Sequence, residues 1–278
     1  MSFYLSRPLI RLLQPLSLLV GLLLLGGSVS CAPIDPQEAL TNLQNPAAEE
    51  TAVALVEAVG PEGAARDAAV TLADGTMIEY TVLLPPNYQV GQPYPTLLAL
   101  PPGSQTANMV TSGLSSYWRD GAMANGWVII SPVAPGGQLF FQGAEAYIPA
   151  FLDQIAAQYP PEGGKFHLSG VSNGGISAFR VAGAHPERFH SLIVLPGYPN
   201  TAADKENLAQ LTALPVALFV GENDSSWIAP MREAAAMLNN AGGNATLTVV
   251  MGEGHFIRSL IGGEQLFALL ESFRRGGG

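Results

Sequence analysis

The chain has 278 residues, of which 48% are hydrophobic and 12% are charged. A chain of this length and apolar content can bury a full core in one large domain, which excludes a disordered or fibrous protein. The formal net charge is −10, and only 12 residues are Lys or Arg. Because nucleic-acid-binding surfaces need clustered basic side chains, this charge argues against nucleic acid as a partner.

The first thirty residues have the layout of a secretory signal. Arg7 and Arg11 precede an apolar run over residues 16–25, and small residues follow at 26–28. This run is shorter than the roughly 20 residues that a bilayer-spanning helix needs. The pattern therefore favours a cleaved signal peptide over residues 1–30, with a retained transmembrane helix as the alternative.

Cys31 is the only cysteine of the chain, so no internal disulfide can form. The segment 28–31, Ser-Val-Ser-Cys, resembles the lipobox of bacterial lipoproteins, although Ser28 stands where that pattern usually has Leu. The resemblance implies that Cys31 is lipidated and becomes the mature N-terminus. It also implies an extracytoplasmic protein that a lipid anchors to a bacterial membrane. Ordinary signal-peptidase cleavage after Ser30 is the alternative.

Residues 31–64 are rich in Ala, Pro, Glu and Gln, and we interpret them as a flexible tether. From residue 65 to 278, short β-rich runs alternate with longer helical ones, which predicts a single α/β domain. Its expected architecture is a mostly parallel sheet of about eight strands flanked by helices. Strands are expected at 68–72, 78–84, 96–100, 127–132, 165–169, 191–195, 216–220 and 246–251. Helices are expected at 144–157, 173–184, 231–241 and 264–273.

The connections refine this picture. The first two strands are expected to pair as an antiparallel hairpin through Asp74-Gly75. Only about 20 residues separate the expected strands at 191–195 and 216–220. This spacing leaves little room for a lid, so we expect a functional site that is open to solvent.

The segment Gly170-Val171-Ser172-Asn173-Gly174 joins an expected strand directly to an expected helix. In that context the motif G-x-S-x-G is typical of a nucleophile elbow. Small residues are needed where the turn is tight, and the helix N-terminus directs N–H groups at a developing oxyanion. In a chain with 31 glycines, an ordinary glycine-rich turn is the alternative interpretation.

An acid and a base follow in the order that such a nucleophile needs. Asp224 comes after the expected strand 216–220, and His255 comes after 246–251. Both loops lie at the carboxyl edge of a parallel sheet, as Ser172 does, so the three residues can converge. The pattern predicts a triad with Ser172 as nucleophile, His255 as general base and Asp224 as the acid that orients it.

Other residues compete for two of these roles. His167 lies inside an expected strand, His185 lies at a helix end, and His190 opens a strand. Each position has a simple structural explanation, which favours His255 as the base. Glu222 is the alternative to Asp224, and a solvated acid in a turn is its structural interpretation.

The loop after the third strand is expected to supply an oxyanion donor. Pro101 and Pro102 have no N–H, so the backbone N–H of Ser104 is expected to act with that of Asn173. Gln105 is the alternative to Ser104 as the donor from this loop.

Residues 80–255 resemble the α/β-hydrolase superfamily, close to its esterase, polyhydroxyalkanoate-depolymerase-like and dienelactone-hydrolase-like members. The resemblance rests on Leu-Leu-Pro-Pro-Asn-Tyr at 83–88, the glycine motif at 170–175, and Ala-His-Pro-Glu-Arg-Phe at 184–189. Pro102-Gly103 replaces the more usual His-Gly of the family. The resemblance implies a serine hydrolase that cleaves small or medium carboxylic esters through an acyl-enzyme and needs no metal or organic cofactor.

Two other functions remain open at this point. One is a serine peptidase of the prolyl-oligopeptidase type, and the other is a non-catalytic lipoprotein that uses the hydrolase fold for binding. Six aromatic residues near the expected carboxyl edge can line an acyl pocket or belong to the ordinary core. They are Tyr117, Trp118, Phe140, Phe141, Tyr198 and Trp227.

Overall fold

The computed structural model describes residues 57–276. The predicted signal peptide, Cys31 and residues 31–56 of the predicted tether lie outside this range. Within it, Val59 is buried and its N–H donates to the carbonyl of Tyr88. The first strand begins at Ala64.

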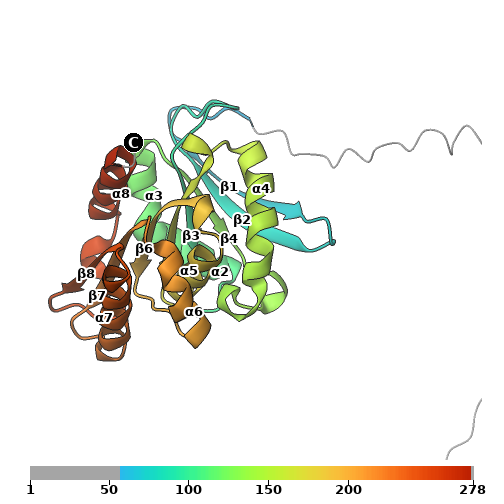
Figure 1. Cartoon of the computed structure of the whole chain (residues 1–278). Coiled ribbons are helices and arrows are strands. Elements are labelled where there is room, and N and C mark those ends of the chain that lie inside the picture. Colours follow the sequence, from blue (N-terminus) through green and yellow to red (C-terminus); the bar gives the residue numbers. More distant parts are fainter. Residues whose placement is uncertain (1–56, 277–278) are drawn as a thin grey trace, which may run out of the picture. The chain divides into compact units, whose positions relative to one another are not determined.

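An eight-stranded sheet forms the centre of the described domain, with the order β1-β2-β4-β3-β5-β6-β7-β8 (Figure 1). β1 and β2 pair antiparallel, β2 pairs antiparallel with β4, and the remaining neighbours are parallel. This confirms the predicted mostly parallel sheet. The strands are β1 (Ala64–Thr71), β2 (Met77–Leu84), β3 (Thr96–Leu100), β4 (Val128–Pro132), β5 (Phe166–Val171), β6 (Phe189–Leu195), β7 (Pro215–Gly221) and β8 (Asn244–Val250).

The hairpin of β1 and β2 turns at Asp74-Gly75, as the sequence predicts. Gly75 has a φ of 86°, a conformation that glycine adopts readily. The carboxylate of Asp74 accepts a hydrogen bond of 2.9 Å from the N–H of Thr76. The register of β1 on β2 follows directly from this turn, with Thr71 opposite Met77.

Helices cover both faces of the sheet. β5 ends at Val171 and α5 (Asn173–Ala184) follows Ser172 at once, so this helix begins where the sequence predicts. The other helices are α2 (Ala107–Gly113), α3 (Arg119–Asn125), α4 (Ile148–Gln158), α6 (Ala202–Glu206), α7 (Ser225–Asn240) and α8 (Glu264–Gly276).

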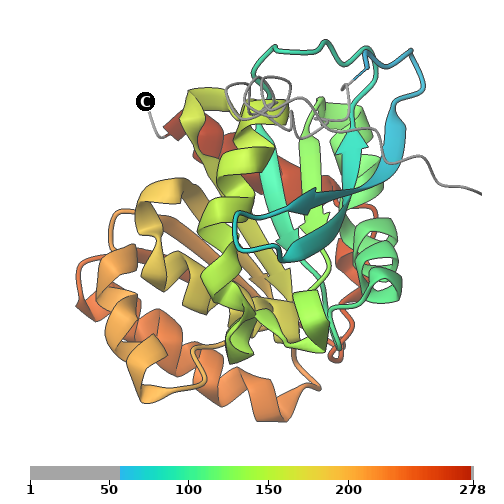
Figure 2. The same cartoon turned by 90° about the vertical axis from the view of Figure 1, so that its right-hand side faces the viewer.

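The two faces have separate cores. Residues of α4, α5 and α7 pack with one set of strand side chains, and residues of α2, α3 and α8 pack with the other set. Figure 2 shows α4 in yellow-green before the sheet and α8 in red behind it. Only α6 and a 3₁₀ segment at Asn207–Leu211 lie between β6 and β7, which confirms that no large lid is inserted there.

Two helix predictions need correction. The expected helix 144–157 opens with a 3₁₀ turn at Ala144–Tyr147, and α4 follows it. The expected helix 231–241 begins earlier, at Ser225, so that Pro230 lies inside α7, and the packing of Met231 and Ala234 in the core offsets the N–H that the proline lacks. We did not expect α2 and α3.

α2 and α3 are joined by a π-helical segment at Leu114–Trp118, in a stretch rich in Ser and Gly. Such residues are weak helix formers, so tertiary packing determines the conformation here. A Cβ at Gly121 in α3 would lie 2.2 Å from the ring of Phe267 in α8. The two helices therefore pack together through direct contact of the Phe267 ring with backbone.

Truncation of Phe267 tests this packing. Its ring is fully buried, with its centroid 5.7 Å from that of Trp127 and 6.3 Å from that of Trp118. We expect Phe267→Ala to lower the free energy of unfolding by about 3–5 kcal/mol, measured by urea denaturation. Met251→Ala, at a side chain that is 74% exposed, is the control and is expected to change it by less than about 0.5 kcal/mol. Similar losses in both variants would contradict this account.

Candidate active site

Ser172 lies in the tight turn between β5 and α5. Its backbone has a φ of 56° and a ψ of −118°, which is a strained conformation for a residue other than glycine. The N–H of Ser172 donates to the carbonyl of Leu195 on β6, and its own carbonyl accepts from Gly175 and Ile176. These bonds fix the strained residue from both sides, in the geometry expected of a nucleophile elbow.

The glycines of the motif are required by close backbone contacts. A Cβ at Gly170 would lie 2.0 Å from the carbonyl oxygen of Gly174. One at Gly174 would lie 2.2 Å from that of Leu100, and one at Gly175 would lie 2.2 Å from that of Pro196. The first turn of α5 thus contacts the carboxyl ends of β3 and β6 directly, and no larger residue fits at these positions.

Ser172, His255 and Asp224 form a line of hydrogen bonds at the carboxyl edge of the sheet. The Oγ of Ser172 lies 2.9 Å from Nε2 of His255, and Nδ1 of His255 lies 2.7 Å from Oδ2 of Asp224. With the carboxylate accepting at Nδ1, the neutral ring carries its proton there and presents Nε2 as the acceptor for the serine hydroxyl. The structure therefore brings the three predicted residues together in the predicted order.

The loops that carry Asp224 and His255 support each other. The N–H of Asn223 donates to the carbonyl of Glu253, and a Cβ at Gly221 would lie 2.2 Å from the carbonyl oxygen of Gly254. Glu222, the alternative acid, accepts a hydrogen bond of 2.9 Å from the N–H of Gly252. Glu222 thus braces the histidine loop, and Asp224 is the acid that contacts His255.

The site is open on one side. The side chain of His255 is 44% exposed and that of Asp224 is 11% exposed. The imidazole of His255 is therefore accessible from solvent, whereas most of the Asp224 carboxylate is covered by the surrounding protein.

The aromatic residues near this edge fall into two groups. Tyr117, Trp118 and Phe140 are buried and belong to the core, which is the second of the two interpretations that the sequence left open. Phe141, Tyr198 and Trp227 are partly exposed. Their exposure leaves faces available to a bound substrate.

Trp227 has the most direct relation to the site. The ring centroid of Trp227 lies 5.0 Å from that of His255. The ring centroid of Tyr198 lies 5.1 Å from that of Trp227. Phe256, which the sequence analysis did not single out, follows His255 and is 48% exposed. Its ring centroid lies 5.5 Å from that of Tyr117, whose pKa burial raises to about 12. Adjacency to the predicted base was the available signal for Phe256.

The loop after β3 turns sharply at Pro102-Gly103-Ser104-Gln105. The N–H of Gln105 donates to the carbonyl of Pro102 at 3.0 Å, so this N–H is used within the turn. Ser104 is exposed inside the turn. Asn173 is the first residue of α5, so its backbone N–H has no acceptor within the helix. Its side-chain amide donates to the carbonyl of Gly103 at 2.9 Å. The two predicted oxyanion donors, Ser104 and Asn173, therefore lie on adjoining segments.

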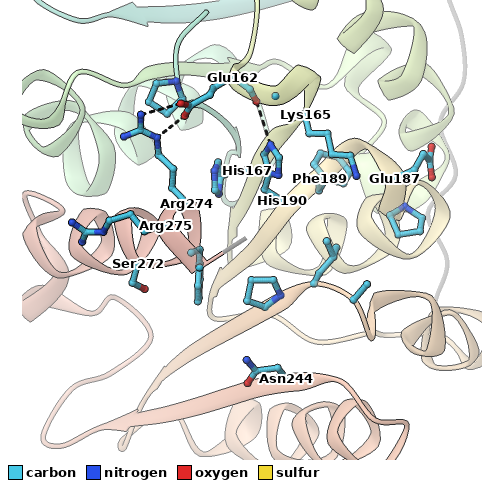
Figure 3. Close-up of a pocket in the computed structure, with 18 of the residues that line it drawn as sticks. Glu162, Lys165, His167, Glu187, Phe189, His190, Asn244, Ser272, Arg274 and Arg275 are labelled. Atoms are coloured by element: carbon cyan, nitrogen blue, oxygen red, sulfur yellow. Dashed lines mark hydrogen bonds and ion pairs between the residues drawn. The ribbon is translucent and has the colours of Figure 1, made fainter. Parts of the chain in front are cut away.

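The remaining histidines lie toward the opposite edge of the sheet. Figure 3 shows His167 and His190 beside a groove of about 1120 Å³, which the first residues of β6, β7 and β8 help to line. Burial and, to a smaller extent, the neighbouring His190 lower the pKa of His167 to about 3. His190 contacts the carbonyl of Glu162, whose carboxylate pairs with Arg274. This groove lies at the amino ends of the strands, away from Ser172.

Among residues 57–276, no three His, Cys, Asp or Glu side chains are grouped as a metal site would require. In the same range, no helix combines the length and the apolar character needed to cross a bilayer.

The strain at Ser172 gives a test of the elbow that is independent of activity. Ser172→Gly and Ser172→Ala both remove the hydroxyl, but only glycine relaxes at a positive φ. We expect Ser172→Gly to be more stable than Ser172→Ala by about 1 kcal/mol, measured by urea denaturation. Equal stabilities, or a more stable alanine variant, would show that the backbone at residue 172 is not strained.

Comparison with known proteins gives a consistent picture. Residues 73–257 match a family model described as "Putative esterase". Dipeptidyl-peptidase 5 of Porphyromonas gingivalis is 28% identical over 144 residues, which cover 47% of this chain. The chain spans only 20% of the length of that relative.

Solved structures share the fold at low sequence identity. An S-formylglutathione hydrolase from Agrobacterium tumefaciens has a TM-score of 0.62 and 16% identity, covering 80% of this chain and 99% of its own. A dienelactone hydrolase from Anabaena variabilis has a TM-score of 0.57 and 14% identity, covering 78% and 96%. These likenesses and the order of the strands identify the α/β-hydrolase fold. Because the family model matches more than half of this chain, the chain belongs to the esterase family of hydrolases.

Proposed function

We propose that this protein is a serine hydrolase that cleaves carboxylic esters through an acyl-enzyme intermediate. The observation that carries the proposal is the hydrogen-bonded line from Asp224 through His255 to Ser172. Membership of the esterase family supports an ester as the substrate.

In the first half of the reaction, Oγ of Ser172 attacks the carbonyl carbon of the ester while its proton passes to Nε2 of His255. The carbonyl oxygen takes the negative charge of the tetrahedral intermediate. When the intermediate collapses, the bond to the alcohol oxygen breaks, and His255 returns the proton to that oxygen. The products of this half are a free alcohol and an acyl ester on Ser172.

In the second half, a water molecule replaces the alcohol. His255 takes a proton from the water, whose oxygen attacks the acyl carbon and forms a second tetrahedral intermediate. When this intermediate collapses, the bond from the acyl carbon to Oγ of Ser172 breaks, His255 returns the proton to Oγ, and the carboxylic acid leaves. Asp224 holds the imidazole in the tautomer that accepts at Nε2, and its negative charge stabilises the imidazolium in both halves. The 44% exposure of the His255 side chain gives water direct access.

The oxyanion is proposed to bind the backbone N–H groups of Asn173 and Ser104. Asn173 begins α5, so its N–H and the positive end of the helix dipole face the turn that carries Ser172. Ser104 belongs to the adjoining turn, in which the N–H of Gln105 is already bonded. This use of Gln105 favours Ser104 as the second donor.

The partly exposed aromatic rings suit an apolar or aromatic group of a small or medium ester. The ring of Trp227 packs at an angle against that of His255, with Tyr198 on its other side, and Phe256 is exposed next to the same histidine in the chain. No lid separates these rings from solvent among the described residues. We propose that they bind the acyl group or the alcohol by apolar contact.

A peptidase is the second candidate, because the curated relative is a dipeptidyl-peptidase. The match covers 20% of that protein, and the reacting groups of an ester hydrolase and a serine peptidase are the same. A non-catalytic binding lipoprotein is disfavoured, since binding alone has no need of the strained serine and its aligned histidine.

We further propose that the protein works outside the cytoplasm, held to a bacterial membrane by a lipid on Cys31. The proposal rests on the sequence of residues 1–31 alone.

The reaction is tested with p-nitrophenyl esters of short and long acyl chains, using the full-length protein. Ser172→Ala and His255→Ala are each expected to lower kcat/KM by at least about 10³-fold, since neither attack nor proton transfer can proceed. Glu222→Gln is the matched control for Asp224→Asn. We expect a large loss in Asp224→Asn. Glu222→Gln is expected to keep nearly full activity, because the side-chain oxygen of Gln can still accept the hydrogen bond from the N–H of Gly252.

Two further measurements separate the alternatives. A fluorophosphonate probe is expected to label the parent protein and not Ser172→Ala, and labelling of Ser172→Ala would refute the assignment of the nucleophile. Matched ester and anilide substrates of one acyl group distinguish the reactions, and faster turnover of the anilide would favour the peptidase. A parent protein that neither turns over substrate nor reacts with the probe would support a binding role.

The anchor is tested by fractionating bacterial cells that produce the full chain. The parent is expected in the membrane fraction and to incorporate labelled palmitate, whereas Cys31→Ala is expected to do neither, because the thiol is the only acylation site. Recovery of both proteins in the soluble fraction would contradict the lipid anchor.

A further inference from the structure

Gln105 is a fully buried polar residue at a strained position. None of its surface is exposed, and its φ of 54° lies in the region that disfavours residues with a Cβ. A buried amide is retained in a core only when its donors and acceptors are paired. The partners of Gln105 therefore indicate what this residue does.

All of the polar groups of Gln105 are paired, and its partners come from three segments. Its backbone N–H and carbonyl bond to Pro102 and Ala134, at 3.0 and 2.9 Å. Its side-chain amide donates to the carbonyl of Pro101 at 3.2 Å and to Oγ of Ser177 at 3.0 Å. Its Oε1 accepts from the N–H of Phe140 at 2.8 Å.

The partner in α5 leads back to the proposed oxyanion donors. The hydroxyl of Ser177 accepts from Gln105 and donates to the carbonyl of Asn173 at 2.9 Å. Asn173 in turn donates from its side chain to the carbonyl of Gly103. A closed circuit of hydrogen bonds thus joins the turn that contains Ser104 to the first turn of α5, one on each side of the proposed oxyanion site.

We propose that Gln105 is a positioning residue that holds the backbone N–H of Ser104 at the distance from the N–H of Asn173 that a tetrahedral oxyanion requires. The inference rests on the proposed function and deepens it. Gln105 does not contact the substrate, because it is buried beneath the turn. It acts through the turn of residues 102–105, because its side-chain amide links this turn to Ser177 in α5.

The test compares variants that remove hydrogen bonds of this circuit with a control variant that removes a buried hydrogen bond elsewhere in the core. Gln105→Leu keeps the size of the side chain and removes its three hydrogen bonds, and Ser177→Ala removes the link to α5. Ser131→Ala is the control, because its buried hydroxyl donates to Ala99 on β3 at 2.7 Å outside the circuit. Each is assayed on a p-nitrophenyl ester at a temperature where circular dichroism shows it folded.

The second readout is inhibition by a trifluoromethyl ketone that carries the same acyl group. Oγ of Ser172 adds to its carbonyl carbon, the carbonyl oxygen takes the negative charge, and the serine proton passes to His255. The affinity of this adduct depends on the oxyanion donors, as the transition state does, whereas the KM of the ester does not.

For Gln105→Leu we expect kcat to fall by about 10- to 100-fold with KM within about threefold of the parent, and the ketone to bind more weakly by the factor lost in kcat/KM. Ser177→Ala is expected to show a smaller loss of the same kind. In the double variant, Ser177→Ala should lower kcat by a smaller factor than it does alone, because both substitutions remove the same hydrogen bond between Gln105 and Ser177. Ser131→Ala should leave both readouts unchanged.

Parent-like kcat and ketone affinity in folded Gln105→Leu would overturn the inference, as would a matching loss in Ser131→Ala. If Gln105→Leu does not fold, unchanged ketone affinity in Ser177→Ala overturns it. A parent without esterase activity or probe labelling would instead refute the proposed function, and this inference with it.

Discussion

The close approach of α5 to the ends of β3 and β6 is the constraint on which the rest of the site depends. The contact is made by backbone, since Gly174 and Gly175 leave no space for a side chain between the helix and the strands. It forces the chain to turn within one residue, and Ser172 takes the strained conformation that results. The same approach sets the first N–H groups of the helix beside the loop that follows β3. One steric requirement thus fixes the position of Ser172 and that of the first residues of α5 together.

The two loops that carry Asp224 and His255 depend on a similar contact at the other end of the sheet. Gly221 at the end of β7 packs on the backbone of Glu253 and Gly254, and Glu222 and Asn223 bond across to the same loop. β8 is the edge strand and is only partly buried, so its loop receives little support from packing on a neighbour beyond it. Hydrogen bonds from the β7 loop compensate for this. The position of His255 therefore depends on these polar contacts as well as on the packing of Trp227 against its ring.

Much of this arrangement could be predicted because it is encoded locally. The eight strands are short β-rich runs, and the residues Ser172, Asp224 and His255 follow strand ends, where a parallel sheet brings loops to one edge. α2 and α3 were not predicted, because Ser and Gly between them obscure the helical pattern that Phe267 and Trp118 stabilise from a distance. The sequence also could not distinguish Phe140, which is buried, from Phe141, which is partly exposed, because their burial depends on tertiary packing. The importance of Gln105 was also hidden, since its burial comes from segments more than thirty residues away.

Trp227 lies three residues after Asp224 in the first turn of α7, and its N–H donates to the carbonyl of Asp224. Its ring also packs against that of His255. One helical turn thus contributes to the orientation of the base and to the wall beside it. Replacement of Trp227 during evolution would alter both at once, whereas Tyr198 and Phe141 come from segments that carry no member of the triad. Divergence in substrate preference among proteins built on this plan is therefore easier through the segments after β4 and β6 than through the start of α7.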